Sequence, residues 1–281
     1  MRAPSHKDTD DRYHSKAPKT DQIARFPVWN YAAHSETSMN ISDATFEPGR
    51  GWTLLKNEIH LWRVFLDKLA VAEKRWRALL SHDEITRADR FHFASDRQNF
   101  TATRALLRIL LGAYIACDPK ELTFLYGERE KPSLAPSLGG GQVEFNVSHS
   151  GARALIAIAR GRAVGVDIEQ VRDNLDHQAL ATRSFSLTEQ AALSALDPSE
   201  QCIGFFRCWT RKEAYIKAHG SGLALPLNAF DVSISSGEKN VLLATRPDAS
   251  QAALWSICAV DAGAGYEAAL CAMGKDWVLK T

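Results

Sequence analysis

Hydrophobic and polar positions follow two different periods along the first half of the chain. A period of two from Glu58 to Val64 predicts a strand, because successive side chains of a strand point to opposite faces. Helical periodicity follows over about 73–80. Ser81, with Glu84 three residues later, predicts a second helix that begins with a capping box. The most regular helical pattern covers about 95–117.

The second half contains the same mixture of periods. Its predicted elements, in chain order, are a hairpin with strands 143–147 and 154–159 and its turn at 148–151, a strand over 163–169, helical segments over about 174–218 with one break near 197–198, and short strands over about 230–279. Because each half combines strands with one long helix, we expect an α+β fold with two similar lobes.

The polar start of the chain lacks any such period. Residues 1–50 are rich in Ser, Thr, Asp, Lys, Pro and His, and we expect a flexible N-terminal extension. The domain prediction is therefore an extension over 1–50, an N-terminal lobe over 51–162 and a C-terminal lobe over 163–281. No internal repeat is strong enough to demonstrate duplication.

Composition narrows the class of protein further. The 281 residues are 45% hydrophobic and 24% charged, which excludes a mainly disordered, collagenous or disulfide-scaffold chain. A formal net charge of +1 gives no global field for nucleic acid or an anionic membrane, so an anion site must be local. Five cysteines without CxxC spacing predict reduced thiols. With no signal peptide and no apolar run that could cross a bilayer, we expect a cytoplasmic protein with no nucleic-acid or membrane partner.

A basic face is the first candidate for such a local anion site. Arg97, Arg104 and Arg108 stand seven and four residues apart in the predicted helix over 95–117, so they share one face. Two interpretations remain open at this point. The face is either an ordinary solvated basic surface or the wall of an anion site.

The strand over 163–169 carries paired carboxylates. With a period of two, Gly165, Asp167 and Glu169 lie on one face, opposite the apolar residues of the strand. Neighbouring like charges are costly unless a cation or a proton relieves them. Oxygen ligands of this kind suit Mg²⁺ or Mn²⁺, with phosphate and water completing the shell. The alternative is a strand end with two solvated acids.

A helical stretch from Trp209 to Lys217 holds a third acid and a lysine. Glu213 and Lys217 are four residues apart and share one helix face. They are either a surface ion pair or a metal carboxylate with a phosphate contact. The segment Asn146 to Ser150 adds one histidine, His149, which is either structural or functional. The chain has no Gly-x-Ser-x-Gly, Walker or Gly-x-Gly-x-x-Gly motif, which disfavours the hydrolase, P-loop and Rossmann classes.

Taken together, Asn146 to Ser150, Gly165 to Glu169 and Trp209 to Lys217 resemble, in order and separation, the motifs of the 4'-phosphopantetheinyl transferase superfamily, in its Sfp-type branch. The likeness extends from about Trp62 to Val232. It implies two pseudo-symmetric α/β lobes with the active site in the cleft between them. It also implies transfer of phosphopantetheine from coenzyme A to a serine of an apo acyl or peptidyl carrier protein, with adenosine 3',5'-bisphosphate released, by a monomeric enzyme.

The resemblance also implies roles for single residues. Asp167, Glu169 and Glu213 correspond to the ligands of Mg²⁺, or of Mn²⁺. Lys217 corresponds to the contact at the phosphate beside the scissile bond and to a proton donor, so Glu213 and Lys217 are the catalytic candidates. The base that deprotonates the incoming serine stays open between Glu213, Glu169 and a metal-bound water.

The same resemblance implies contacts to coenzyme A. Ser148 and His149 correspond to the pair that holds its phosphates, Lys131 to a lysine of a Gly-Lys-Pro loop, and Arg87 to a basic residue at the nucleotide phosphate. Asp167 and Lys217 join this set at the diphosphate.

Two positions depart from the family pattern. Glu130 stands where the loop usually has glycine, and the position near Glu84 is not basic. Two other functions remain as alternatives, a non-catalytic coenzyme A-binding module and a metal-dependent pyrophosphohydrolase.

Overall fold

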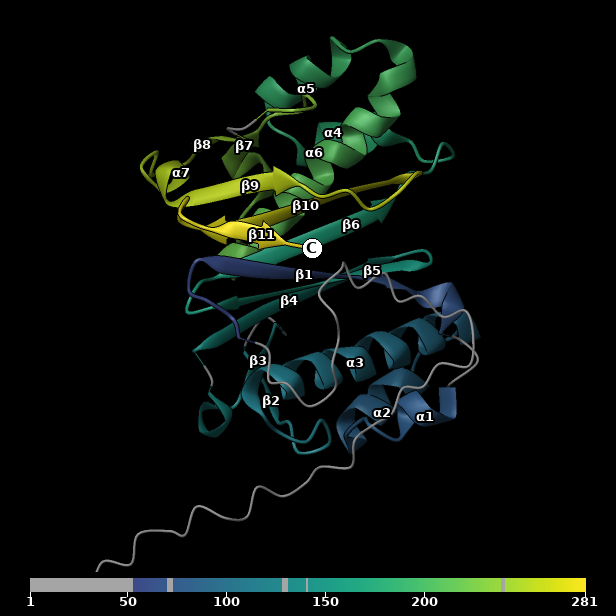
Figure 1. The fold of residues 1–281 in the computed structure, drawn as a ribbon. Helices are drawn as coiled ribbons and strands as arrows, with labels where there is room; N and C mark the ends of the chain where they lie inside the picture. The colour runs from purple at the N-terminus through teal and green to yellow at the C-terminus, as the bar shows by residue number, and fades with distance from the viewer. Residues whose placement is uncertain (1–52, 70–72, 128–130, 140, 239–240) are drawn as a thin grey trace, which may run out of the picture. The chain divides into compact units, whose positions relative to one another are not determined.

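The computed structural model describes residues 53–69, 73–127, 131–139, 141–238 and 241–281. The extension predicted over 1–50 and the departure at Glu130 lie outside these ranges. Most described strands belong to two sheets, with strand orders β11-β1-β5-β4 and β6-β10-β9 (Figure 1). The fold is therefore a mixture of helices and strands, as the two periods of the sequence predict.

The four-stranded sheet brings together the two ends of the described chain. Its members are β1 (Glu58–Phe65), β4 (Val143–Ser150), β5 (Arg153–Arg160) and β11 (Val278–Lys280). β5 pairs antiparallel with both β1 and β4, whereas β11 pairs parallel with β1. The last strand, which we assigned by sequence to the C-terminal lobe, thus covers an edge of β1 that would otherwise expose unpaired backbone groups.

The turn predicted at 148–151 is wrong. Ser148, His149 and Ser150 continue β4, and the chain reverses at Gly151, whose φ of +54° suits a residue without a side chain. The error arose because Ser and His interrupt the apolar alternation, although polar side chains at the end of a strand pair as well as apolar ones do.

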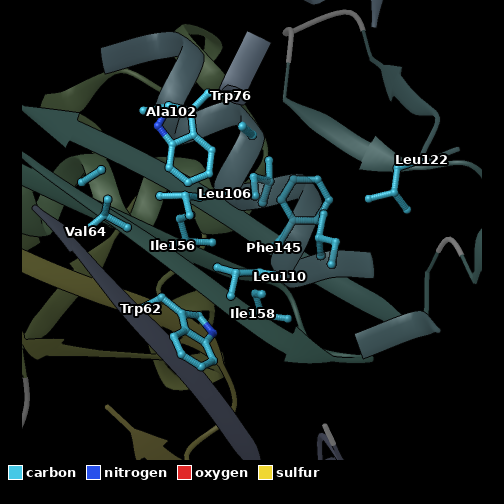
Figure 2. Close-up of a cluster of buried hydrophobic side chains, with 14 of the residues drawn as sticks. Trp62, Val64, Trp76, Ala102, Leu106, Leu110, Leu122, Phe145, Ile156 and Ile158 are labelled. Carbon is cyan, nitrogen blue, oxygen red and sulfur yellow. The ribbon is translucent and has the colours of Figure 1, made fainter. Parts of the chain in front are cut away.

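The described helices beside this sheet are α1 (Glu73–Arg77), α2 (His82–Asp89) and α3 (Ala94–Ile115). The same part of the chain contains a small sheet of β2 (Phe124–Tyr126) and β3 (Pro132–Leu134), and the 3₁₀ turns η1 (Leu66–Lys68) and η3 (Pro136–Leu138). The apolar stripe of α3 packs on one face of the sheet (Figure 2), where Leu106 and Leu110 meet Phe145 and Ile156. Full burial stabilises each such side chain by about 1.5–3 kcal/mol. The capping box of α2 is confirmed, with the Ser81 amide donating to Glu84 at 2.9 Å.

The three-stranded sheet carries the second set of helices. Its strands are β6 (Val164–Gln170), β9 (Trp255–Ala259) and β10 (Tyr266–Met273); around it lie α4 (His177–Ser184), α5 (Leu187–Ser194), α6 (Pro198–His219), α7 (Gln251–Leu254), the pair β7 (Phe230–Val232) and β8 (Leu242–Thr245), and the 3₁₀ turns η4 (Gly222–Ala224) and η5 (Leu227–Ala229). The predicted helical region has a second break at Phe185 and Ser186, because the Ser186 hydroxyl caps α5.

Two further hydrophobic cores fix the layers. One lies between the sheets, where Val164, Val166 and Ile168 of β6 meet Leu61 of β1 and Leu155 of β5. The other lies between the three-stranded sheet and α6. The alternation predicted for β6 is thereby confirmed, with its odd-numbered residues turned toward α6. In the described ranges, no helix is long and apolar enough to span a membrane.

Gly165 sets how closely α6 approaches β6. A Cβ atom at this position would lie 2.2 Å from the Ala214 carbonyl oxygen and 2.3 Å from the Ala218 amide nitrogen. Only glycine leaves room for the helix backbone here. Because Glu213 and Lys217 lie on the same stretch of α6, this contact brings them beside the carboxylates of β6.

Candidate active site

A cavity of about 410 Å³ collects most of the residues that the sequence singled out. Its described lining comes from α2 and α3 with the segment between them (Arg87, Phe91, Phe100, Thr103, Arg104 and Leu107), from Lys131 and Pro132, from β4 (Asn146, Val147 and His149), and from α6 and the turn after it (Glu213, Ile216, Lys217, Gly220 and Gly222). Cations are frequent in this lining, so the cavity suits an anionic ligand.

Two arginines and a phenylalanine form one wall. The guanidinium carbons of Arg87 and Arg104 lie 5.8 and 5.7 Å from the centre of the Phe100 ring. The Arg104 side chain is only 10% exposed, and its Nε lies 3.6 Å from Glu84 Oε1. Among the described residues, the buried Arg104 Nη1 has no hydrogen-bond partner. A buried guanidinium that is not fully satisfied is poised to bind an anion.

The three arginines of the predicted basic face have different environments. Arg108 is buried and donates to Glu84 Oε2 at 2.7 Å, as well as to the carbonyl oxygens of Pro119 and Leu122. Arg97 lies 4.0 Å from Glu73 at the surface. Of the three, Arg104 lines the cavity. The interpretation as a surface face is right for Arg97, Arg108 is a buried structural arginine, and the interpretation as the wall of an anion site stays a prediction for Arg104.

A hydrogen-bonded network joins β4, β6 and α6 beside the cavity. Lys217 Nζ lies 2.5 Å from Asp167 Oδ1 and 3.1 Å from Ser148 Oγ, and the Ser148 hydroxyl donates to the same Asp167 oxygen at 2.8 Å. Asp167 Oδ2 is buried and, within the described part of the chain, has no hydrogen-bond partner. A nearby cation stabilises a buried carboxylate oxygen that has no hydrogen-bond partner.

Two further carboxylates feel the charge of Asp167. Burial raises the pKa of Glu169, and the charge of Asp167 adds to that shift. Burial and the charge of Asp167 likewise raise the pKa of Glu213. Such mutual repulsion is relieved by a divalent cation, and these oxygen donors fit Mg²⁺ or Mn²⁺.

Over the described ranges, however, no three His, Cys, Asp or Glu side chains form a ready-made metal cluster. The expected ligand set of Asp167, Glu169 and Glu213 is therefore not assembled in the described residues, and Lys217 lies beside Asp167 instead.

His149 and Lys131 lie on the cavity wall in different ways. The His149 side chain stays open to the cavity, yet the enclosing protein lowers its pKa by desolvation, and the positive charge of Lys217 lowers it further. Lys131 Nζ donates to the carbonyl oxygens of Lys217 at 2.8 Å and of Val164 at 3.2 Å. Burial lowers the pKa of Lys131. Lys131 therefore ties its loop to α6 and β6.

Comparison with known proteins identifies the family of the chain that forms this cavity. Residues 70–160 match the model "4'-phosphopantetheinyl transferase, N-terminal", and residues 163–271 match that of the 4'-phosphopantetheinyl transferase superfamily. The 4'-phosphopantetheinyl transferase HetI of Nostoc sp. is 37% identical over 225 residues, which cover 80% of this chain and 92% of HetI. The chain belongs to the 4'-phosphopantetheinyl transferase superfamily. The resemblance inferred from the three motifs is thereby confirmed.

Further relatives place this phosphopantetheinyl transferase in the Sfp-type branch. The 4'-phosphopantetheinyl transferase Sfp of Bacillus subtilis is 30% identical over 221 residues, covering 77% of this chain and 93% of Sfp. The 4'-phosphopantetheinyl transferase AcpT of Escherichia coli is 38% identical over 124 residues, covering 44% of this chain and 58% of AcpT.

Sequence reasoning about the transferase missed several cavity residues. Phe100 belongs to the apolar stripe of α3, and nothing in the sequence separates a core residue of that stripe from a wall residue. Asn146 belongs to the motif Asn146 to Ser150, but the sequence assigned it no role. Ser148, by contrast, is turned into the network with Asp167 and is not part of the described cavity lining.

Proposed function

We propose that this chain transfers the 4'-phosphopantetheine group of coenzyme A to a serine of an apo acyl or peptidyl carrier protein, releases adenosine 3',5'-bisphosphate and depends on Mg²⁺, or on Mn²⁺. The observation that carries the proposal is the contact of Lys217 with Asp167 at the edge of a cation-lined cavity. One oxygen of this aspartate has no hydrogen-bond partner among the residues that the structure describes. A transferase of diphosphate esters needs such a concentration of cations around the phosphate oxygens.

The cavity walls support binding of coenzyme A through its phosphates. Arg104 offers a buried guanidinium, and Arg87 and His149 line the same space. Lys131 contributes through its positive charge and through its hold on the Lys217 backbone. Phe100 beneath the two guanidinium groups excludes water on one side, which strengthens their attraction for an anion.

Asp167, Glu169 and Glu213 would hold the metal ion. When bound, the ion supplies positive charge to the diphosphate and so stabilises the charge that develops there. The fit rests on the donor set and on Asp167 Oδ2, which has no partner in the described part of the chain. Ser150 donates to Glu169 at 2.7 Å and keeps that carboxylate oriented.

The chain's own residues would handle the proton. In the proposed step, the carrier serine oxygen forms a bond to the phosphorus that bears pantetheine, and the bond from that phosphorus to the bridging oxygen breaks. Glu213 accepts the serine proton, since it is the carboxylate of the three that lines the cavity. Lys217 Nζ donates a hydrogen bond and then a proton to the departing bridging oxygen. The products are a phosphopantetheinyl serine and adenosine 3',5'-bisphosphate.

We further propose that residues 51–162 and 163–281 form two pseudo-symmetric lobes with the active site in the cleft between them. The proposed enzyme is a monomer located in the cytoplasm, without nucleic-acid or membrane partners. A cavity lined by both α3 and α6 of one chain supports a monomer. Five free cysteines support a reducing compartment.

Intact-mass spectrometry tests the function directly. An apo carrier protein is incubated with the chain, coenzyme A and Mg²⁺, and a second sample contains EDTA. We expect one phosphopantetheine on the carrier serine without EDTA and none with it. Cleavage of coenzyme A while the carrier stays apo would identify a pyrophosphohydrolase instead. Binding of coenzyme A without any reaction, over fatty-acid, polyketide and peptide carriers, would identify a binding module.

Single-residue variants, with a matched control, test in the same assay which side chains are needed for transfer. Asp167→Ala and Glu213→Ala should abolish transfer while circular dichroism shows a folded protein. Glu200→Ala, which removes an exposed acid from the same helix as Glu213, is the control and should keep wild-type activity. Full activity of Asp167→Ala would exclude the proposed metal site.

A further inference from the structure

Alternate side chains of β4 bond to alternate backbone amides of β6. Asn146 Oδ1 accepts from the Val166 amide at 2.8 Å, Ser148 Oγ from the Ile168 amide at 3.4 Å, and Ser150 Oγ from the Gln170 amide at 3.1 Å; these six residues keep a constant offset of twenty positions. A constant offset means that the two strands run parallel and in a fixed register. We call these three contacts the side-chain ladder.

The ladder lies where two sheets present open edges. β4 ends the order of the four-stranded sheet, and β6 ends that of the three-stranded sheet. The backbone pairings of the described strands do not join β4 to β6, although the two strands contact each other. Without the side chains of β4, the amide of Val166 in the core would be left without an acceptor. Buried amides without acceptors are strongly unfavourable, so the ladder specifies the register.

The two serines of the ladder also hold the acids that stand between the rungs. Ser148 donates to Asp167 at 2.8 Å, and Ser150 donates to Glu169 Oε2 at 2.7 Å. A hydroxyl has one donor and two acceptor positions. Ser148 uses all of them, because it donates to Asp167 and accepts from Lys217 and from the Ile168 amide.

We propose that Asn146, Ser148 and Ser150 are positioning residues that fix β6 against β4 and, through the two serines, set the orientation of Asp167 and Glu169. Ser148 acts on Asp167 and on Lys217 through its hydroxyl group. The part of this inference that concerns metal affinity rests on the proposed function. The part that concerns the register of β6 does not.

Amide exchange measured by NMR tests the register without metal or substrate. Asn146→Ala should accelerate exchange of the Val166 amide on the order of tenfold, and Ser150→Ala that of the Gln170 amide by a smaller factor. Ser150→Thr keeps the hydroxyl and should restore the Gln170 rate. Ser194→Ala removes an exposed hydroxyl that bonds within α5 and is the control. Unchanged exchange at both amides would overturn the ladder.

Titration with Mn²⁺ alone tests the effect on the acids. Ser150→Ala should weaken Mn²⁺ binding by about tenfold, Ser150→Thr should restore it, and Ser194→Ala should match the wild type. If Ser150→Ala lowers the melting temperature but leaves Mn²⁺ affinity and KM for coenzyme A unchanged, Ser150 is merely structural and the proposal for Glu169 is overturned. If the wild type itself binds no Mn²⁺, the proposed metal site fails, and the exchange experiment still decides the ladder.

Discussion

Two lysines of α6, Lys212 and Lys217, are five residues apart and have opposite environments. Lys212 Nζ lies 2.7 Å from Glu189 Oε1, from the Leu227 carbonyl oxygen and from the Phe230 carbonyl oxygen, and its side chain is 0% exposed. Lys217 contacts Asp167 and Ser148, lines the cavity and is 28% exposed.

The two lysines differ in how many of their donors the protein satisfies. An ammonium group has three donors, and Lys212 uses each of them on the protein. Lys217 uses two, and the Asp167 it contacts keeps one oxygen without a partner among the described residues. A saturated buried pair holds α6 in place, whereas the unsaturated pair at the cavity is the one to which we assign binding and reaction in the proposed function.

Replacing Lys217 should give the largest effect on activity. Lys217→Met removes the proposed donor to the departing oxygen, and we expect transfer to fall by roughly 10²–10³-fold. Stability should fall less than in Lys212→Met, because Lys217 is 28% exposed and Asp167 keeps its hydrogen bond from Ser148. Single-turnover mass spectrometry at saturating coenzyme A measures the rate. A variant within threefold of the wild-type rate would contradict the role given to Lys217.

Replacing Lys212 should give the largest effect on stability. Lys212→Met leaves Glu189 charged and buried, and we expect the free energy of unfolding to fall by ~3–5 kcal/mol. Urea denaturation of Lys212→Met and Lys217→Met side by side measures the contrast. Equal losses in the two variants would remove the distinction between the two lysines.

A methyl group at Gly165 tests whether the close approach of α6 to β6 positions Glu213 and Lys217. Gly165→Ala forces the helix backbone away from β6, at a cost of about 1–3 kcal/mol, and should slow transfer because Glu213 and Lys217 move with the helix. Gly127→Ala is the control, because a Cβ at Gly127 meets nothing within 4 Å. Wild-type activity and stability in Gly165→Ala would show that the close approach is dispensable.

The smallest effect concerns pH and His149. Its pKa is lowered below the usual 6.5, so the imidazole is neutral near pH 7 in the free protein, and a bound phosphate would raise that pKa again. Binding then takes up a proton, so affinity for coenzyme A should rise as pH falls from 8 to 6, by about threefold. Calorimetric titration at several pH values checks the slope. His149→Gln should flatten it, and an unchanged slope would assign the proton elsewhere.

Local patterns predicted a large part of the molecule. The strand that begins at Glu58, the capping box at Ser81 and the two faces of β6 were right, because each depends on the period of a few neighbouring residues. The turn at 148–151 was wrong, since polar residues in a strand are satisfied by another sheet. That partner is not local in sequence.

The charged residues show the same difference between what local spacing predicts and what other segments decide. The spacing of Arg97, Arg104 and Arg108 placed them on one helix face, but Arg108 is buried with Glu84 of α2 and with carbonyl groups of the segment after α3. Likewise, β11 joins the sheet of β1 across most of the chain. Sequence spacing carries no information about such contacts.

By itself, the sequence determined the family and named the candidate acids, since three motifs in order indicate both. Tertiary structure alone decided which arginine of α3 lines the cavity, which serine uses all its hydrogen-bonding positions and how β6 is held against β4. The physical reason is that a side chain's chemistry is fixed by its type, whereas its desolvation and its hydrogen-bond partners are fixed by segments that meet only in the folded chain.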